Sequence, residues 1–302
     1  MEELIQKIER LKKENDFVIL AHYYVDGAVQ DIADYVGDSF YLSKVATEVE
    51  AKNILFAGVS FMGESAKLFN PEKHVYMADV TADCPMAHMV TVDRIKEVRE
   101  QYDDVAVVCY VNSTAEIKAV SDVCVTSSNA IKVVKNINNK RIFFVPDNNL
   151  GRYVAKQLPE KEFIFNDGFC HVHKSIDPKL VAEAKEHHPD ALVLAHPECT
   201  EDVLELADYI GSTAGILDYA TESECKKFII CTEMGIFFKL SKQNPDKKFY
   251  SVGHRQFCPN MKKVSLEKVA AVMENPTEEV LLSDDIMNEA CKPLQKMLEL
   301  AK

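Results

Sequence analysis

The sequence has no segment suited to a membrane or to export. No apolar run approaches the roughly 18 residues that a transmembrane helix needs. Residues 1–15 are rich in charge and typical of a helix, without the apolar centre of a signal peptide. We therefore expect a cytoplasmic protein that has no membrane partner.

Positive charge is also scarce. The chain carries 35 Lys and Arg against 48 Asp and Glu, which gives a net charge of −13. Repulsion from phosphate groups disfavours a nucleic-acid partner and an anionic lipid surface. An anionic substrate would therefore need a local binding site that offsets the net negative charge of the chain.

Two further absences restrict the chemistry. None of the nine cysteines is spaced CxxC, which disfavours a zinc ribbon and a thioredoxin-type site. No low-complexity or linker segment divides the chain, so its domains should form one body. Since a reducing compartment keeps thiols free, the cysteines indicate core filling, metal ligation or catalysis.

What the sequence does contain is a threefold repeat. Three short apolar runs, rich in β-branched residues, do not alternate with polar residues as a half-exposed strand would. Such runs are typical of parallel strands that are covered on both faces. They lie at 18–21, 106–109 and 192–195, and the polar residues His22, Tyr110 and His196 follow them.

The repeat continues at constant spacing. Seventeen residues beyond each of those polar positions comes a hydroxyl, at Ser39, Ser127 and Thr213. Each copy then reaches one cysteine in a turn context, and these cysteines are separated by 86 and 88 residues: Cys84, Cys170 and Cys258. A chain of 302 residues with 47% apolar content can bury a large core in two or three domains.

We therefore predict an α/β fold of three repeated three-layer αβα domains with parallel sheets, around a pseudo-threefold axis. The expected limits are 1–100, 101–187 and 188–302, with a C-terminal helix from about Ile286 to Leu300 that packs back on the body. Polar sites gather outside the carboxyl ends of parallel strands, so one loop from each domain can reach a common centre.

Three converging cysteines would make a metal centre. Thiolates are soft ligands, and a four-iron cluster held by three of them leaves one iron free to act as a Lewis acid. A lone cysteine is more often a small buried hydrophobe. That is our interpretation of Cys109, Cys124, Cys225, Cys231 and Cys291, while Cys199 stays ambiguous.

The strand ends supply acid–base candidates in three tripeptides: His22-Tyr23-Tyr24, Tyr110-Val111-Asn112 and His196-Pro197-Glu198. Histidine, glutamate and tyrosine can transfer protons once their surroundings tune them. A lone histidine is usually structural, but equivalent positions favour catalysis for His22 and His196, and His173 should lie near the cysteines. We expect the others at the surface or in structural roles: His74, His88, His171, His187, His188 and His254.

The hydroxyl residues have two interpretations. Ser39, Ser127 and the pair Ser212-Thr213 each lie where a predicted helix begins, so ordinary N-capping would explain any one of them. Three at one spacing, aimed at one centre, instead predict an anion cage of helix N-termini. Such a cage would let an acidic protein bind an acidic substrate.

The chain resembles the quinolinate synthase family along nearly its whole length. The resemblance rests on nine motifs, each weak alone: AHYY at 21–24, GDS at 37–39, FMGE at 61–64, CPMA at 84–87, YVNST at 110–114, TSSNA at 126–130, PDNNLGRYV at 146–154, HPEC at 196–199 and GST at 211–213. It implies three αβα domains and a [4Fe-4S] cluster held by one cysteine from each. It also implies an enzyme that joins iminosuccinate to dihydroxyacetone phosphate, releases phosphate and water, and forms quinolinate on the route to NAD.

Position by position, the resemblance assigns the cluster to Cys84, Cys170 and Cys258, and proton transfer to Tyr24, Tyr110 and Glu198. It assigns iminosuccinate contacts to His22, Ser39, Tyr110, Val111, Asn112, Ser127, His196, Pro197, Glu198 and Thr213. We expect His173 and Ser212 to bind substrate as well. Longer family members carry CxxCP at the third ligand, whereas this chain has Phe257-Cys258-Pro259 without the earlier cysteine. Redox control by a disulfide beside the cluster is therefore not expected.

Two other interpretations stay open. One is a different iron–sulfur hydro-lyase that removes water from a hydroxy acid. The other is a non-enzymatic iron–sulfur sensor, which would not need three polar strand ends facing inward. For the enzyme that the resemblance implies, a short-lived iminosuccinate also suggests transient contact with the enzyme that makes it.

Overall fold

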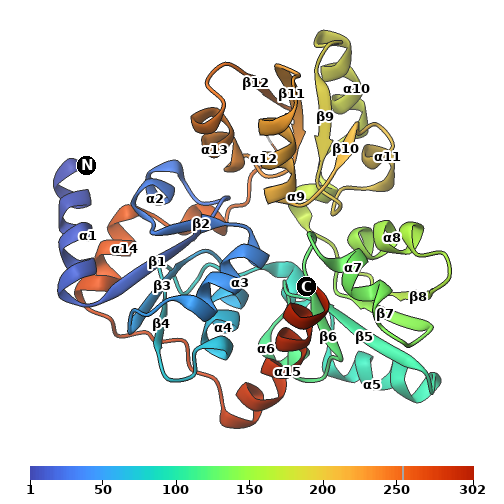
Figure 1. The fold of residues 1–302 in the computed structure, drawn as a ribbon, viewed down its shortest axis with the longest axis horizontal. Coiled ribbons are helices and arrows are strands. Elements are labelled where there is room, and N and C mark those ends of the chain that lie inside the picture. Colours follow the sequence, from blue (N-terminus) through green and yellow to red (C-terminus); the bar gives the residue numbers. More distant parts are fainter. Residues whose placement is uncertain (254) are drawn as a thin grey trace.

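Three parallel four-stranded sheets carry the fold. The structure, a computed structural model, describes residues 1–253 and 255–302. In each sheet the second strand in sequence lies at the edge, followed in space by the first, the third and the fourth. Helices cover the sheets, and the three units surround a common centre (Figure 1). The predicted α/β class with three repeated αβα layers is confirmed. His254, expected at the surface or in a structural role, lies outside the described residues.

The first unit follows helix α1 (Glu2–Glu14). Its elements are β1 (Phe17–His22), α2 (Gly27–Ile32), β2 (Tyr35–Gly37), α3 (Ser39–Glu48), β3 (Asn53–Ala57), α4 (Ser60–Phe69) and β4 (His74–Met77). A short 3-10 helix, η1 (Pro85–His88), leads out of it.

The second unit repeats this order. Its elements are α5 (Val92–Gln101), β5 (Val105–Tyr110), α6 (Ala115–Ala119), β6 (Val123–Val125), α7 (Ala130–Lys135), β7 (Arg141–Val145), α8 (Asn148–Gln157) and β8 (Glu162–Phe165). The short helix α9 (His171–Lys174) follows.

The third unit has the same plan. Its elements are α10 (Pro178–His187), β9 (Leu192–Ala195), α11 (Glu201–Leu204), β10 (Tyr209–Ile210), α12 (Thr213–Glu222), β11 (Lys227–Cys231), α13 (Ile236–Gln243) and β12 (Lys248–Ser251). The domain limits expected from the sequence stay a prediction.

The first strand of each sheet is buried along all or nearly all of its length, as the apolar runs predict. Every residue of β1 and of β5 is buried. The parallel register aligns the carboxyl ends of neighbouring strands: His22 pairs with Gly37, and Tyr110 pairs with Val125. The polar residue after the first strand and the helix after the second strand therefore begin at the same edge of the sheet.

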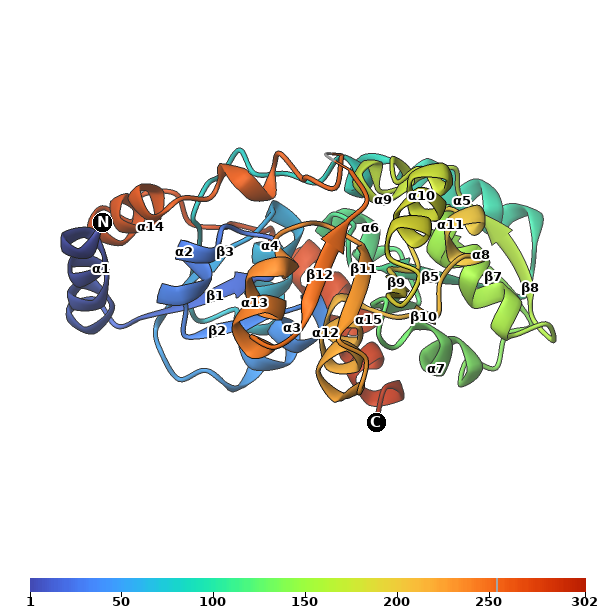
Figure 2. The ribbon, with the colours of Figure 1, turned by 90° about the horizontal axis from the view of Figure 1, so that it is seen from above.

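The chain after the third sheet returns to the other two units. A 3-10 turn, η2 (Met261–Lys263), leads to α14 (Leu266–Glu274), which packs on α1. The last helix, α15 (Asp284–Leu300), packs on α6, β6 and α4 and begins two residues before the predicted Ile286. Figure 2 shows α14 beside α1 at one end of the molecule.

The hydrophobic core is divided unequally. One continuous cluster runs from Ile8 in α1 through the sheets of the first two units to Met297 in α15. The third unit has two smaller clusters, one with Ile229 and one with Ile230, and the latter also includes Tyr23 of the first unit. Within the described residues, no helix combines the length and the apolar character that crossing a membrane requires.

Candidate active site

One cavity at the centre gathers residues from all three units. It has an empty volume of about 750 Å³, including the part open to solvent. Most of the site residues predicted from the sequence line it: His22, Tyr24, Ser39, Cys84, Tyr110, Asn112, Ser127, Cys170, His173, His196, Glu198, Thr213 and Cys258. His171, expected at the surface or in a structural role, lines it too.

Three predicted substrate contacts do not line this cavity. Val111 is buried and lines a smaller neighbouring cavity. Pro197 is buried in the turn between β9 and α11. Ser212 caps α12, since its hydroxyl accepts a hydrogen bond of 3.1 Å from the amide of Gly215. The roles assigned to these residues stay predictions.

The three cysteines lie at the starts of short helical turns. Cys84 and Cys170 directly precede η1 and α9, and Cys258 lies three residues before η2. Main-chain amides of the following residues act to lower the pKa of each thiol: those of Met86 and Ala87 for Cys84, that of His173 for Cys170, and those of Asn260 and Met261 for Cys258. Such amides stabilise negative charge on sulfur.

Burial keeps these thiols protonated unless a positive charge is supplied. It raises the pKa of Cys84 to about 12, and it also raises the pKa values of Cys170 and Cys258. A bound metal centre deprotonates coordinating thiols outright. The buried cysteines are therefore compatible with a metal centre that would bind them as thiolates.

The spacing of the three cysteine sulfurs does not suit one metal ion bound by all three. Among the described residues, the only three Cys, His, Asp or Glu ligand atoms within 4.8 Å of one another belong to Cys170, His173 and Glu198. A single zinc ion bound to Cys84, Cys170 and Cys258 would draw their sulfurs closer than that. In an iron–sulfur cluster each thiolate binds a different iron, so the sulfurs can stand further apart.

Glu198 is the centre of a buried polar network. The hydroxyl of Tyr110 donates a hydrogen bond of 2.5 Å to Oε1 of Glu198, and Nδ1 of His173 lies 2.8 Å from Oε2. Burial alone would raise the pKa of Glu198, but His173 and His196, together with these hydrogen bonds, lower it. Glu198 is therefore an ionised carboxylate that accepts from both sides.

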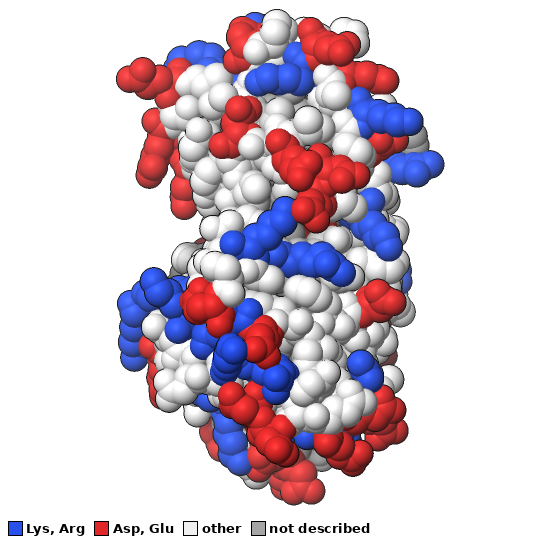
Figure 3. All heavy atoms as spheres, turned by 90° about the vertical axis from the view of Figure 1, so that its right-hand side faces the viewer, with Lys and Arg blue, Asp and Glu red and all other residues white. Residues whose placement is uncertain are grey.

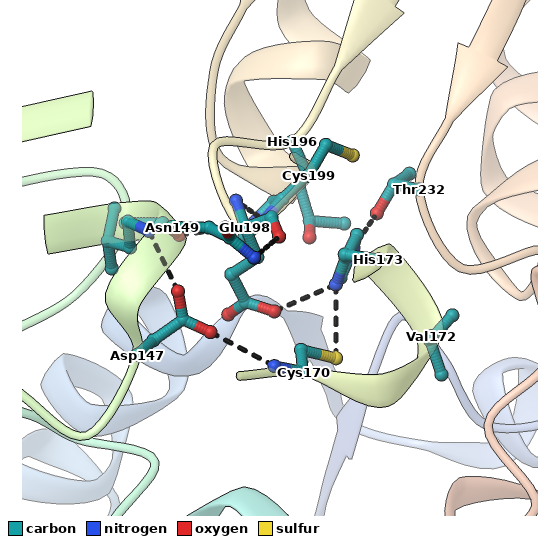
Figure 4. A network of polar contacts seen from close by, with 12 residues as sticks. Asp147, Asn149, Cys170, Val172, His173, His196, Glu198, Cys199 and Thr232 are labelled. Atoms are coloured by element: carbon teal, nitrogen blue, oxygen red, sulfur yellow. Dashed lines mark hydrogen bonds and ion pairs between the residues drawn. The ribbon is translucent and has the colours of Figure 1, made fainter. Parts of the chain in front are cut away.

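The network continues from His173 to Tyr24. Nε2 of His173 lies 2.8 Å from the hydroxyl of Thr232, which lies 2.8 Å from the hydroxyl of Tyr24 (Figure 4 shows the first of these contacts). In the tautomer of His173 whose Nδ1–H donates to Glu198, Nε2 accepts from Thr232, and Thr232 then accepts from Tyr24. The donor directions thus run consistently from Tyr24 to Glu198.

Two histidines flank this network and are held neutral. Burial lowers the pKa of His22 and of His196 to about 3, although the Glu198 carboxylate opposes the shift in both. The ring of His196 stacks on that of His173, with centroids 4.5 Å apart. Neutral imidazoles can exchange hydrogen bonds with a polar substrate without adding charge.

The predicted hydroxyls lie at three helix openings around the cavity. Ser39 is the first residue of α3 and Thr213 is the first residue of α12. Ser127 precedes α7, and its hydroxyl lies 3.2 Å from Nε2 of His196. The carboxylate of Asp38 caps α3 and takes a bond from the Tyr41 amide. These helix N-termini can bind a carboxylate or phosphate.

Sequence reasoning missed Asp147, Thr232 and Glu233. Asp147 lies two residues after β7, and Thr232 and Glu233 directly follow β11. The same signal that selected His22, a polar residue at the end of a buried strand, applies to them.

The comparisons with known proteins all find the same family. The model of a family described as quinolinate synthetase A protein matches residues 6–299. A protein of Fusobacterium nucleatum named quinolinate synthase is 54% identical over 98% of both chains. Proteins of the same name from Caldicellulosiruptor saccharolyticus and Clostridioides difficile are 49% and 47% identical, over 100% and 99% of this chain and 99% of each relative.

Proposed function

Because the chain belongs to the quinolinate synthetase A family it is an enzyme, and we propose that it condenses iminosuccinate with dihydroxyacetone phosphate to form quinolinate, phosphate and water. The product would feed de novo NAD biosynthesis. The observation that carries this proposal is the cavity in which three cysteines face His22, Tyr110 and Glu198.

Cys84, Cys170 and Cys258 would hold a [4Fe-4S] cluster at this cavity. When bound, the cluster supplies an iron without a protein ligand, which acts as a Lewis acid toward an oxygen or carboxylate group. The apolar side chains beside the cysteines, among them Met86 and Met261, help to keep this part of the cavity dry.

The remaining residues would bind and orient the substrates. Both are anions, and the helix openings at Ser39, Ser127 and Thr213 offer main-chain amides and hydroxyls for carboxylate and phosphate groups. Neutral His22 and His196 and the amide of Asn112 add hydrogen bonds. The buried side-chain oxygen of Asn112 has no partner within the protein, which suits an acceptor waiting for a substrate N–H or O–H.

Glu198 and the tyrosines would move protons. Burial raises the pKa values of Tyr24 and Tyr110 well above the usual range, so both phenols stay protonated and can donate to a developing oxyanion. Glu198, ionised between Tyr110 and His173, can accept a proton when the enol forms and return it when water leaves. The chain through Thr232 connects Tyr24 to the same carboxylate.

We also propose that the enzyme works in the cytoplasm, because nine free cysteines and an exposed iron need a reducing compartment. Iminosuccinate is short-lived, so the enzyme that produces it would be a transient partner.

Iron analysis followed by a product assay tests the proposal. Protein purified without oxygen should contain iron and sulfide, whereas Cys84→Ala, Cys170→Ala and Cys258→Ala should each lose most of both. Wild-type protein given iminosuccinate and dihydroxyacetone phosphate should then produce quinolinate. An iron-free preparation would exclude the cluster, and a cluster-bearing protein that forms no quinolinate would indicate another iron–sulfur hydro-lyase.

A further inference from the structure

Each of the three cysteines donates its main-chain N–H to a carboxylate. The amide of Cys170 donates to Oδ2 of Asp147 over 3.0 Å (Figure 4). The amide of Cys258 donates to Oε1 of Glu233 over 3.1 Å. The amide of Cys84 donates to Oδ1 of Asp83 over 2.8 Å.

The main chain around these contacts also repeats three times. At the start of the helix after the third strand, one amide donates to the carbonyl two residues before the cysteine, over 2.8 Å in every unit. The pairs are Ser60 with Ala82, Asn148 with Gly168, and Met234 with Gln256. The carboxylates can therefore be compared position by position.

The comparison shows one contact made in two ways. Asp147 and Glu233 occupy equivalent positions, directly before Asn148 and Met234, where the first unit has Val59. In the first unit Asp83, the neighbour of the cysteine, accepts instead, and the Ser60 hydroxyl donates to it. Phe169 and Phe257 stand at the position of Asp83 in the other units. The carboxylate contact is kept although the residue that supplies it changes.

Asp147 and Glu233 also fix the helix that follows. The second oxygen of Asp147 accepts from the Leu150 amide over 2.7 Å, and that of Glu233 accepts from the Gly235 amide over 2.6 Å. Both carboxyl groups are fully buried. Removal of such an acceptor would leave a buried amide without a partner, which is costly.

We propose that Asp83, Asp147 and Glu233 are positioning residues, each of which holds the amide of its cysteine so that the thiol faces the cavity before iron arrives. The inference rests on the proposed cluster. It predicts that loss of an acceptor loosens the cluster through the cysteine loop, without removing any metal ligand.

Iron retention tests the inference. Asp147→Leu and Glu233→Leu remove the acceptor, whereas Asp147→Asn and Glu233→Gln retain one oxygen for two amides. After anaerobic reconstitution, the leucine variants should lose iron to a chelator about tenfold faster than wild type, with the amide variants between them. The cluster's reduction potential and EPR spectrum should shift in the same order. Asp177→Leu is the control, because Asp177 caps α10 through the Lys179 amide and contacts no cysteine.

The outcomes separate the two proposals. Circular dichroism and thermal melting of the apo proteins identify folded variants, and Asp147→Asn and Glu233→Gln carry the test if the leucine variants do not fold. Wild-type protein that takes up no iron overturns the proposed cluster and this inference together. Wild-type protein that binds a cluster, with iron loss and potential unchanged in the folded variants, overturns the inference alone.

Discussion

The first two units and the third unit have the same sheet topology but are held in different ways. The first two share one apolar core that α14 and α15 complete. The third unit has two small clusters, one of which also includes Tyr23 of the first unit. Polar groups make further contacts with the rest, such as Tyr110 with Glu198 and Tyr24 with Thr213. The candidate site therefore lies along the boundary between the third unit and the other two, called the seam below. Hydrogen bonds within the site help to hold the two sides together.

Close packing at the seam supports these polar contacts. A side chain at Gly235, where α13 begins, would meet the Cα atom of Tyr24 at 2.6 Å and the carbonyl of Tyr23 at 2.7 Å. Figure 3 shows acidic side chains above a band of basic ones near the middle of one face. One ion pair between the second and third units joins Lys156 of α8 to Glu201 of α11. The third unit thus approaches the first closely at Gly235.

The largest effect should come from the central polar contact of the seam. Glu198→Gln should lower the turnover rate by about 10²–10⁴-fold, because the amide cannot accept the proton that the carboxylate takes. Iron content should be unchanged, since Glu198 is not a proposed cluster ligand. Quinolinate formation and iron per chain, measured on the same preparation, check this. Near wild-type turnover would remove Glu198 from the mechanism.

A core substitution should separate the two regions. Leu294 in α15 and Leu240 in α13 are both fully buried, so truncation to alanine should cost about 2–5 kcal/mol of unfolding free energy at either site. Hydrogen exchange should rise in α6 and β6 for Leu294→Ala, but only in the third unit for Leu240→Ala. An equal rise in hydrogen exchange through all three units, for either variant, would contradict the division of the core.

Lowering the pH should reduce the folding stability through one histidine on each side of the seam. Burial lowers the folded-state pKa values of His22 and His196 to about 3, and the Glu198 carboxylate opposes both shifts. Lys262 adds to the lowering at His22, and His173 adds to it at His196. The unfolded chain therefore binds more protons below its histidine pKa of about 6.5. Stability is full above that value and should fall by about 2 kcal/mol per histidine between pH 7.5 and pH 5.

Urea unfolding of the apo protein at these pH values measures the slope. Glu198 should not contribute in this window, because a lowered carboxylate pKa affects stability only below its unfolded value near 4.3. His22→Gln and His196→Gln should each remove about half of the dependence. An unchanged slope in both variants would place the effect elsewhere, for example at His171, whose pKa burial also lowers.

The smallest effect should come from an ion pair across the seam. Lys242 of α13 pairs with Asp31 of α2, and both side chains are largely exposed. Lys242→Ala should change the unfolding free energy by less than about 1 kcal/mol, because water and salt screen such pairs. A larger loss in chemical denaturation would mean that surface charge, rather than buried polar contact, holds the third unit.

The sequence predicts the fold well because its signals are local. The apolar runs at β1, β5 and β9 and the constant spacing to Ser39, Ser127 and Thr213 specify a repeated parallel sheet and the edge where its polar groups gather. The helix at Leu300 was also expected, but its packing on α6 and β6 was not, since a pattern along one helix does not identify the surface it covers.

The partners within the site could not be predicted. Thr232 lies between Tyr24 and His173 only because three units place their strand ends at one centre. Asp147 and Asp83 hold their cysteines from different sequence positions, so comparison of the repeats does not align them. Such contacts depend on how the units pack, which no single segment encodes.

The return of α14 and α15 to the first two units has a consequence for synthesis on the ribosome. Residues from Met261 to Met297 belong to the core that begins at Ile8, so that core stays incomplete until they emerge. The third unit, with cores of its own, can fold while that larger part still waits. We expect nascent chains that stop before α14 to expose the apolar surfaces of α1 and α6 and to need protection by chaperones.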